Sequence, residues 1–184
     1  KELRAIASFF NNDNTKLLLQ KDASEIIVKN EDLSNTKYIA FSTHAVVAGE
    51  MREVDEPGII LTPPKSASKE NDGLLTASEI MNLDLNAELV ILSACNTGSG
   101  MTASSEGLTG LAKSFFYAGA NQLIISNWRV TDKYASRLTT NMIKHLTNEN
   151  TTTAQALQVS INKLIEENLH PIFWGPFMLV GNGI

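Results

Sequence analysis

Three apolar runs along the chain have the length and composition of buried strands. They cover residues 37–43, 88–94 and 122–127, and two weaker candidates lie at 58–62 and 176–180. The three stronger runs are apolar on both faces, as strands of a parallel sheet are when helices cover both sides of it. Each run is too short for a helix, so the pattern predicts strands spread along the whole chain.

Helical patterns separate several of these strands. Residues 104–118 place apolar side chains along one face of a helix, and similar stripes lie within 132–146 and 157–165. Strands that alternate with helices of this length form right-handed crossovers and a mainly parallel sheet. We therefore predict an α/β fold, a three-layer α/β/α sandwich, formed by one domain over residues 1–184.

Local signals predict where some of these helices begin and end. Thr76 and Glu79 have the spacing of a capping box, and so do Asp22 and Glu25. Gly119 follows the helix predicted over 104–118 and is a suitable C-cap residue. The polar segments 45–57 and 63–73 are predicted to be surface loops. The acidic side chains of the first loop are interpreted as a solvated surface or as an attractor for basic substrates.

Composition and charge exclude several functional classes. Of the 184 residues, 43% are hydrophobic and 19% are charged, and the formal net charge is −5. A net negative charge argues against a nucleic-acid-binding surface, which needs basic side chains to neutralise phosphates. No apolar run approaches the roughly 18–20 residues that span a bilayer, so no membrane partner is expected. Because the chain begins with Lys1 rather than Met, we expect it to be a fragment of a longer protein.

The only cysteine, Cys95, and one of the three histidines follow predicted strands. Cys95 comes directly after residues 88–94, and His44 directly after 37–43. In a parallel sheet the carboxyl ends of the strands share one edge, where ligand sites form. If the two strands are neighbours, the thiol and the imidazole can meet there. A lone cysteine excludes a disulfide framework and a multi-cysteine zinc site, and we predict neither metal nor cofactor.

This pair of side chains can cleave an acyl bond. A free thiol has a pKa of about 8.5, and a nearby imidazole that takes its proton produces the nucleophilic thiolate. The same imidazole can then protonate the leaving amine. Backbone amides of Cys95 and of the glycine-containing turn 96–100 are suited to stabilise the oxyanion. We interpret His145 as a packed or solvated helix residue and His170 as a loop residue.

Other interpretations of the pair remain open. A cysteine after an apolar strand is often a small buried hydrophobic residue. The domain could then be a scaffold that binds a partner without catalysis. It could also be another thiol hydrolase or transferase on a doubly wound sheet.

Several motifs resemble those of one family. Residues 42–44 read Ser-Thr-His, residues 92–98 read Leu-Ser-Ala-Cys-Asn-Thr-Gly, and residues 170–177 read His-Pro-Ile-Phe-Trp-Gly-Pro-Phe. In this order they resemble the CHAT family of caspase-like peptidases, which is related to caspases, gingipains and separase. The resemblance extends over residues 17–181. It implies a caspase-like fold, a cysteine endopeptidase acting on a protein or peptide substrate, and His44 and Cys95 as its catalytic dyad.

The resemblance also suggests two further site residues and a context. The family commonly has glycine after the catalytic histidine, where its amide helps to bind the oxyanion, and this chain has Ala45. Residues 128–132, Trp-Arg-Val-Thr-Asp, resemble a separase segment whose acidic residue contacts a basic substrate side chain, which implies this role for Asp132; Asp132 is also a suitable helix N-cap. Family members usually follow helical-repeat or other sensor domains. A chain with one free thiol is expected in the cytoplasm.

Overall fold

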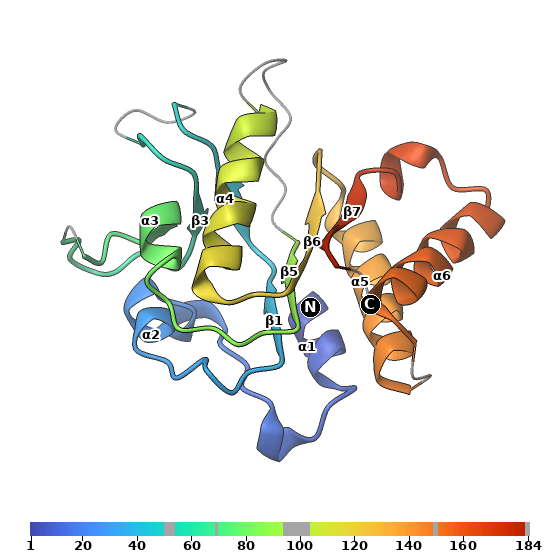
Figure 1. Ribbon diagram of the computed structural model, residues 1–184, viewed down its shortest axis with the longest axis horizontal. Helices are drawn as coiled ribbons and strands as arrows, with labels where there is room; N and C mark the ends of the chain where they lie inside the picture. The colour runs from blue at the N-terminus through green and yellow to red at the C-terminus, as the bar shows by residue number, and fades with distance from the viewer. Residues whose placement is uncertain (50–53, 69, 94–103, 149–150, 183–184) are drawn as a thin grey trace.

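The computed structural model describes residues 1–49, 54–68, 70–93, 104–148 and 151–182. Its main sheet has four strands in the order β1-β5-β6-β7 (Figure 1). The first three strands are parallel, and β7 runs antiparallel to β6. The sheet is therefore mainly parallel, as predicted. The strands are β1 (Tyr38–Phe41), β5 (Leu89–Leu92), β6 (Gln122–Ser126) and β7 (Phe177–Gly181).

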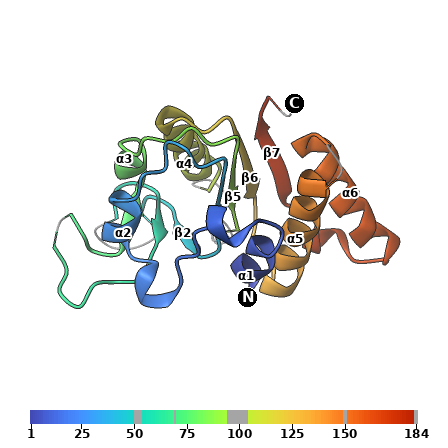
Figure 2. The same ribbon diagram turned by 90° about the horizontal axis from the view of Figure 1, so that it is seen from below.

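Helices pack against both faces of this sheet, as Figures 1 and 2 show. On one face, Val90 and Leu92 of β5 share a core with Phe115 of α4 (Ser104–Ala118). On the other face, Leu89 and Ile91 share a core with Leu138 of α5 and with residues of two further helices. The helices on this second face are α1 (Glu2–Ala7), α5 (Asp132–Asn148) and α6 (Thr153–Glu166). The two cores explain why the strands are apolar on both faces.

A second, smaller sheet lies beside α3 and α4 and was not expected as a unit. It is antiparallel and has the order β2 (His44–Val46), β3 (Gly58–Ile60) and β4 (Leu74–Thr76). Only β3 was predicted, because it lies within the apolar run 58–62. The three residues of β2 and the three of β4 are too few to show a strand period. The loop predicted over 45–57 is wrong at its start, where Ala45 and Val46 are buried strand residues.

The remaining elements are short. The helices α2 (Glu25–Lys29) and α3 (Ala77–Ile80) flank the smaller sheet, and three short 3-10 segments occupy connections. The 3-10 segments are η1 (Asn12–Asn14), η2 (Gln20–Asp22) and η3 (Pro171–Phe173). No helix in the described part of the chain is long and apolar enough to cross a membrane.

Two of the predicted helix ends are confirmed and one is wrong. Thr76 and Glu79 form a capping box at the start of α3. Gly119 follows α4 with a φ of +111°, and a Cβ at this position would lie 1.9 Å from the carbonyl oxygen of Leu85, so only glycine fits. The box predicted for Asp22 and Glu25 does not form, because α2 begins at Glu25 itself.

Candidate active site

The strands that precede the two predicted dyad residues are neighbours. Phe41 of β1 is in register with Leu92 of β5, and the Ser93 amide donates a 2.9 Å hydrogen bond to the Phe41 carbonyl. The ladder thus continues to the carboxyl ends of both strands. His44 comes three residues after Phe41, and Cys95 comes three residues after Leu92. Cys95 and the turn 96–100 lie outside the described residues, so the structure describes one half of the predicted dyad.

His44 begins β2, where the chain leaves the main sheet and enters the smaller one. Its side chain is exposed, and the residue lies opposite Ile60 of β3. The hydroxyl of the preceding Thr43 donates a 2.5 Å hydrogen bond to the Ile60 carbonyl. The backbone of the candidate base is therefore held by a strand pair and is not part of a free loop.

Ala45 follows in the same strand, with its side chain buried opposite Ile59. Ala45 is not among the described residues with a positive φ. Alanine would be a poor substitute for glycine only if this position required a positive φ. Ala45 does not have one, and alanine adopts ordinary negative φ values without strain.

A buried carboxylate links the ends of β1 and β5. Glu2 of α1 is only 7% exposed. Its Oε2 accepts a 2.9 Å hydrogen bond from the hydroxyl of Ser42, one residue beyond β1. Its Oε1 accepts a 2.5 Å hydrogen bond from the hydroxyl of Ser93, one residue beyond β5, and a 2.8 Å bond from Thr139 of α5. Sequence analysis did not identify this group of side chains.

The segment after β6 forms the next part of the same sheet edge. The Trp128 indole donates a 3.0 Å hydrogen bond to the Ile172 carbonyl, and the Asn127 amide donates a 3.0 Å bond to the Pro176 carbonyl. Because β7 is antiparallel to β6, these bonds join the residues after β6 to those before β7. Two of the motifs singled out in the sequence, at 128–132 and 170–177, therefore lie against each other.

Asp132 is exposed and is the first residue of α5. The cap position belongs to Thr131, whose carbonyl accepts the first helical hydrogen bond from the Ala135 amide at 3.1 Å. Asp132 is thus not the cap residue. Its charge still lies in the first turn, where the helix dipole favours an anion.

The other two histidines have local roles. The Nδ1 atom of His170 accepts a 3.2 Å hydrogen bond from the Ile172 amide and caps η3. His145 is partly buried in the last turn of α5, and its carbonyl accepts a 3.3 Å hydrogen bond from the Thr151 hydroxyl. Both observations agree with the interpretation of these residues from the sequence.

Glu56, in the acidic loop predicted over residues 45–57, makes hydrogen bonds that hold local structure. The carboxylate of Glu56 accepts hydrogen bonds of 2.8 Å and 2.7 Å from the amide and hydroxyl of Ser78, in the first turn of α3. Neither interpretation of the loop, as a solvated surface or as a substrate attractor, fits this residue. Residues 50–53, which include Glu50 and Glu53, lie outside the described ranges.

A second buried carboxylate lies near the smaller sheet. Glu25 has no exposed surface and accepts hydrogen bonds from the Asp72 amide at 2.9 Å and the Gly73 amide at 2.8 Å. It also pairs with Lys29, which contacts Glu79 at 2.6 Å. Burial alone would lower the pKa of Lys29, but the hydrogen bonds to Glu25 and Glu79 outweigh it and raise this pKa.

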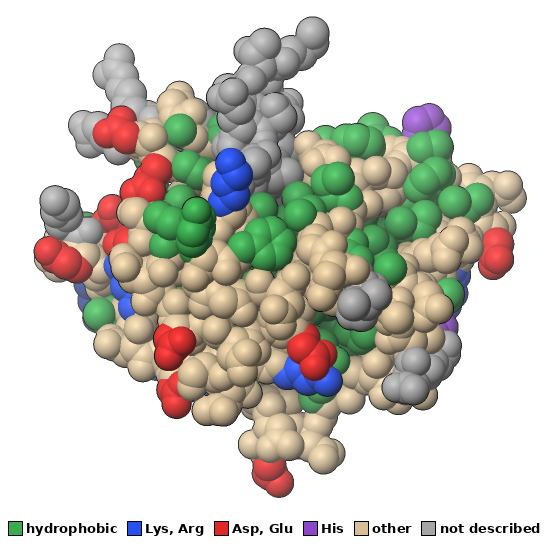
Figure 3. Space-filling model, viewed as in Figure 1, with side chains coloured by type: hydrophobic (Ala, Val, Ile, Leu, Met, Phe, Trp, Pro, Cys, Tyr) green, Lys and Arg blue, Asp and Glu red, His purple; other side chains and the backbone are tan. Residues whose placement is uncertain are grey.

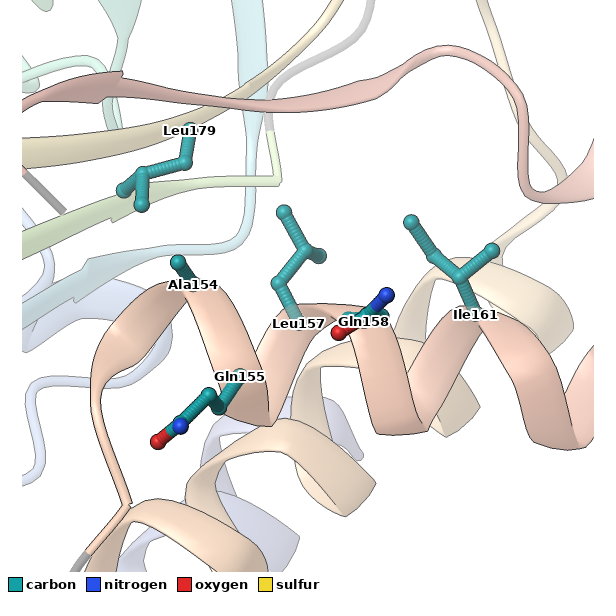
Figure 4. A pocket seen from close by; sticks show the side chains of 6 residues that line it. All are labelled: Ala154, Gln155, Leu157, Gln158, Ile161 and Leu179. Carbon is teal, nitrogen blue, oxygen red and sulfur yellow. The ribbon is translucent and has the colours of Figure 1, made fainter.

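A groove with a volume of about 400 Å³ lies between α6 and β7 (Figure 4). It is lined by Ala154, Gln155, Leu157, Gln158, Ile161 and Leu179. None of these side chains is titratable, and none belongs to the segments that follow β1, β5 or β6. This groove therefore offers no acid or base for catalysis. Within the described ranges, no three His, Cys, Asp or Glu side chains come together to hold a metal ion.

On the face shown in Figure 3, hydrophobic side chains gather over α4 and over the α6–β7 side, whereas charged side chains are scattered. Tyr117 of α4 is 78% exposed and Met178 of β7 is 40% exposed.

CHAT domains belong to the caspase-like peptidase family. The model of the CHAT domain family matches residues 1–182, and the chain therefore belongs to this family. It is also 27% identical over 114 residues to tetratricopeptide repeat protein 28 of Mus musculus. That match includes 60% of this chain, but the chain spans only about 4% of the length of the mouse protein.

Proposed function

We propose that this chain is a cysteine endopeptidase in which His44 activates Cys95. The observation that carries the proposal is the pairing of β1 with β5, because His44 and Cys95 each follow the paired residues Phe41 and Leu92 by three positions. Adjacent parallel strands end at one edge of a sheet, where ligand sites form, and this supports the pairing of His44 with Cys95. Membership of the CHAT domain family supports the same assignment.

In the proposed reaction, the His44 imidazole takes the thiol proton of Cys95. The thiolate sulfur attacks the peptide carbonyl carbon, a C–S bond forms, and the carbonyl electron pair moves to the oxygen. The backbone amides of Ala45 and Cys95 stabilise this oxyanion. The C–N bond then breaks as the imidazolium gives its proton to the leaving amine. A water molecule, deprotonated by His44, hydrolyses the thioester and restores the thiol.

The same proposal includes a preference for cleavage after arginine or lysine. Asp132 is exposed at the start of α5, and the segment leading to it begins at the carboxyl end of β6. A carboxylate in this place can accept two hydrogen bonds from a guanidinium group of the substrate. The exposed side chain has no hydrogen bond or ion pair with the described residues that would occupy it.

The domain is proposed to act under the control of another part of a longer protein. We propose that residues 1–184 form one three-layer α/β/α peptidase domain in the cytoplasm. The mouse relative is named for tetratricopeptide repeats, which are helical repeats, and this name supports a helical-repeat context for the present chain. Such a repeat would bind the signal that activates cleavage.

Alkylation of the single thiol tests the dyad directly. Because Cys95 is the only cysteine, iodoacetamide reports on this residue alone. We expect rapid alkylation near neutral pH, and we expect Cys95→Ala to abolish cleavage of a peptide library while the protein remains folded. A folded Cys95→Ala protein that retains a tenth of the wild-type activity would refute the assignment. If Cys95 reacts only as fast as an ordinary free thiol and no peptide is cleaved, a non-catalytic scaffold would be favoured.

Asp132→Asn tests the substrate preference. The substitution should lower kcat/KM on arginine substrates about 100-fold, which corresponds to about 2.7 kcal/mol of transition-state stabilisation. Thermal unfolding should change little, because Asp132 is exposed and does not occupy the cap position. Asp84→Asn, a change of the same type at an exposed position before β5, is the matched control. A wild-type preference for apolar or acidic residues would contradict the role given to Asp132.

A further inference from the structure

The Glu2 carboxylate joins three elements that are far apart in the sequence. Its hydroxyl donors, Ser42, Ser93 and Thr139, are separated from it by 40, 91 and 137 residues. Two of the donors directly follow the adjacent strands β1 and β5, and the third belongs to α5. The helix α1 that carries Glu2 packs against α5. A single side chain thus connects the ends of both strands to the helix layer on one face of the sheet.

The two serines lie close in the sequence to the proposed catalytic residues. Ser42 lies two residues before His44, and Ser93 lies two residues before Cys95. The last backbone bond of the ladder joins Ser93 to Phe41. Beyond that bond, hydrogen bonds from Ser42 and Ser93 to the Glu2 carboxylate connect the two strand ends. Each oxygen atom of Glu2 binds the hydroxyl from one strand end, so separation of the ends would break a hydrogen bond.

The arrangement also differs from a general packing contact. Burial of a carboxylate is costly unless its oxygens receive hydrogen bonds, and a neighbouring cation usually contributes. The oxygens of Glu2 receive three hydroxyl hydrogen bonds, and no ion pair involving Glu2 is found among the described residues. An apolar side chain would fill the same space at less cost. The carboxylate is therefore suited to hold hydroxyl groups in fixed positions.

We propose that Glu2 is a positioning residue for the peptidase, which fixes the end of β1 against the end of β5 and so holds His44 in place for the reaction. This inference rests on the proposed function. Displacement of a catalytic group by about 1 Å can cost about 100-fold in rate. Loss of the link should therefore weaken the activation of the thiol and lower kcat, while substrate affinity changes little.

The decisive experiment uses four variants of the chain. Ser42→Ala combined with Ser93→Ala removes both strand-end hydroxyls through small changes at positions that are not buried. Glu2→Ala removes the carboxylate, and Glu2→Gln keeps its shape and an acceptor oxygen. Ser160→Ala is the matched control, because Ser160 is a buried serine whose hydroxyl bonds Ala156 and Asn141 on the α5–α6 pair and neither strand.

Cleavage kinetics and the pH profile of iodoacetamide alkylation are measured for each variant, together with thermal unfolding. We expect the double serine variant and Glu2→Ala to lower kcat about tenfold or more with a nearly unchanged KM. Their alkylation profiles should shift towards that of an ordinary thiol. Glu2→Gln should recover part of kcat. Ser160→Ala should lower the melting temperature and leave both the alkylation profile and kcat as in the wild type.

The outcomes separate this inference from the proposed function. A reactive wild-type thiol together with wild-type kcat and alkylation profile in the double serine variant would overturn the role of Glu2 and leave the dyad intact. A wild-type thiol that titrates like a free cysteine, without cleavage, would overturn the dyad and the role of Glu2 together. If Glu2→Ala does not fold, the double serine variant and Glu2→Gln decide the question.

Discussion

The two buried carboxylates of this protein are compensated in different ways. Glu25 receives two backbone amide hydrogen bonds and an ion pair with Lys29, so its charge is balanced where it lies. Glu2 receives hydrogen bonds from three side-chain hydroxyls. The charge of the carboxylate strengthens the hydrogen bonds in both groups, but among the described residues only the Glu25 group includes a cation that balances this charge.

The difference separates a structural region from a chemical one. The Glu25 group attaches α2 to residues 72–73 and to α3, and no candidate catalytic residue belongs to it. The Glu2 group lies where β1 and β5 end, and its two serines precede the proposed dyad residues by two positions in the sequence. Changes near Glu25 should therefore affect the free energy of unfolding, whereas changes at the sheet edge should affect the reaction rate.

The sharpest test of this division is His44→Ala. Because His44 acts as the base in the proposed reaction, its loss should lower kcat/KM by at least about 100-fold. Its side chain is exposed, so the free energy of unfolding should change by no more than about 0.5 kcal/mol. Peptide cleavage and urea unfolding measure the two effects. His145→Ala, in α5, is the matched histidine control, and equal losses of activity in both variants would contradict the assignment.

Glu25→Ala should have the opposite effect. The variant leaves the amides of Asp72 and Gly73 without their acceptor and removes one partner of Lys29, so we expect a loss of about 3 kcal/mol in the free energy of unfolding. The folded fraction should retain the wild-type alkylation rate at Cys95. Glu88→Ala is the control, since the pair of Lys37 and Glu88 is more than half exposed and should contribute less than about 1 kcal/mol. Similar losses in the two variants would show that burial does not decide the effect.

Glu79→Gln should give the smallest effect, and one that depends on pH. Burial tends to raise the pKa of Glu79, but hydrogen bonds from Lys29 and Thr76 outweigh it and lower this pKa. The stabilisation is therefore present above the ordinary pKa of about 4.3 and is lost as the pH falls through the lower folded value. We expect a loss of about 1 kcal/mol at pH 7. Urea unfolding at pH 7, 5, 4 and 3 should show the variant and wild-type stabilities converging in acid; a constant difference would contradict the pKa shift.

Sequence reasoning predicted most of the main sheet because its signals are local. Buried parallel strands produce continuous apolar runs, and β5 and β6 lie within one or two residues of the predicted bounds. The helix predicted over 104–118 is α4. The capping box at Thr76 also depends on neighbours in the sequence. The family assignment from the sequence motifs is confirmed by the match of the CHAT domain model.

The parts that were not predicted depend on distant residues. No local pattern marks Glu2, because its partners are 40 to 137 residues away. The box expected at Asp22 failed for a related reason: the Glu25 carboxylate instead binds the amides of Asp72 and Gly73, 47 and 48 residues further along. The adjacency of β1 and β5, which the dyad requires, also needed the three-dimensional structure. Cys95 itself stays a prediction.

The distance along the chain between Glu2 and Thr139 has a consequence for the order in which the protein is made. Thr139 is added to the growing chain 137 residues after Glu2. At about 5–20 residues per second, this interval lasts on the order of ten seconds. Within this interval His44 and Cys95 are synthesised first, and α5 follows from Asp132 onwards. A nascent chain therefore carries both residues of the proposed dyad before the helix that completes their anchor has been synthesised.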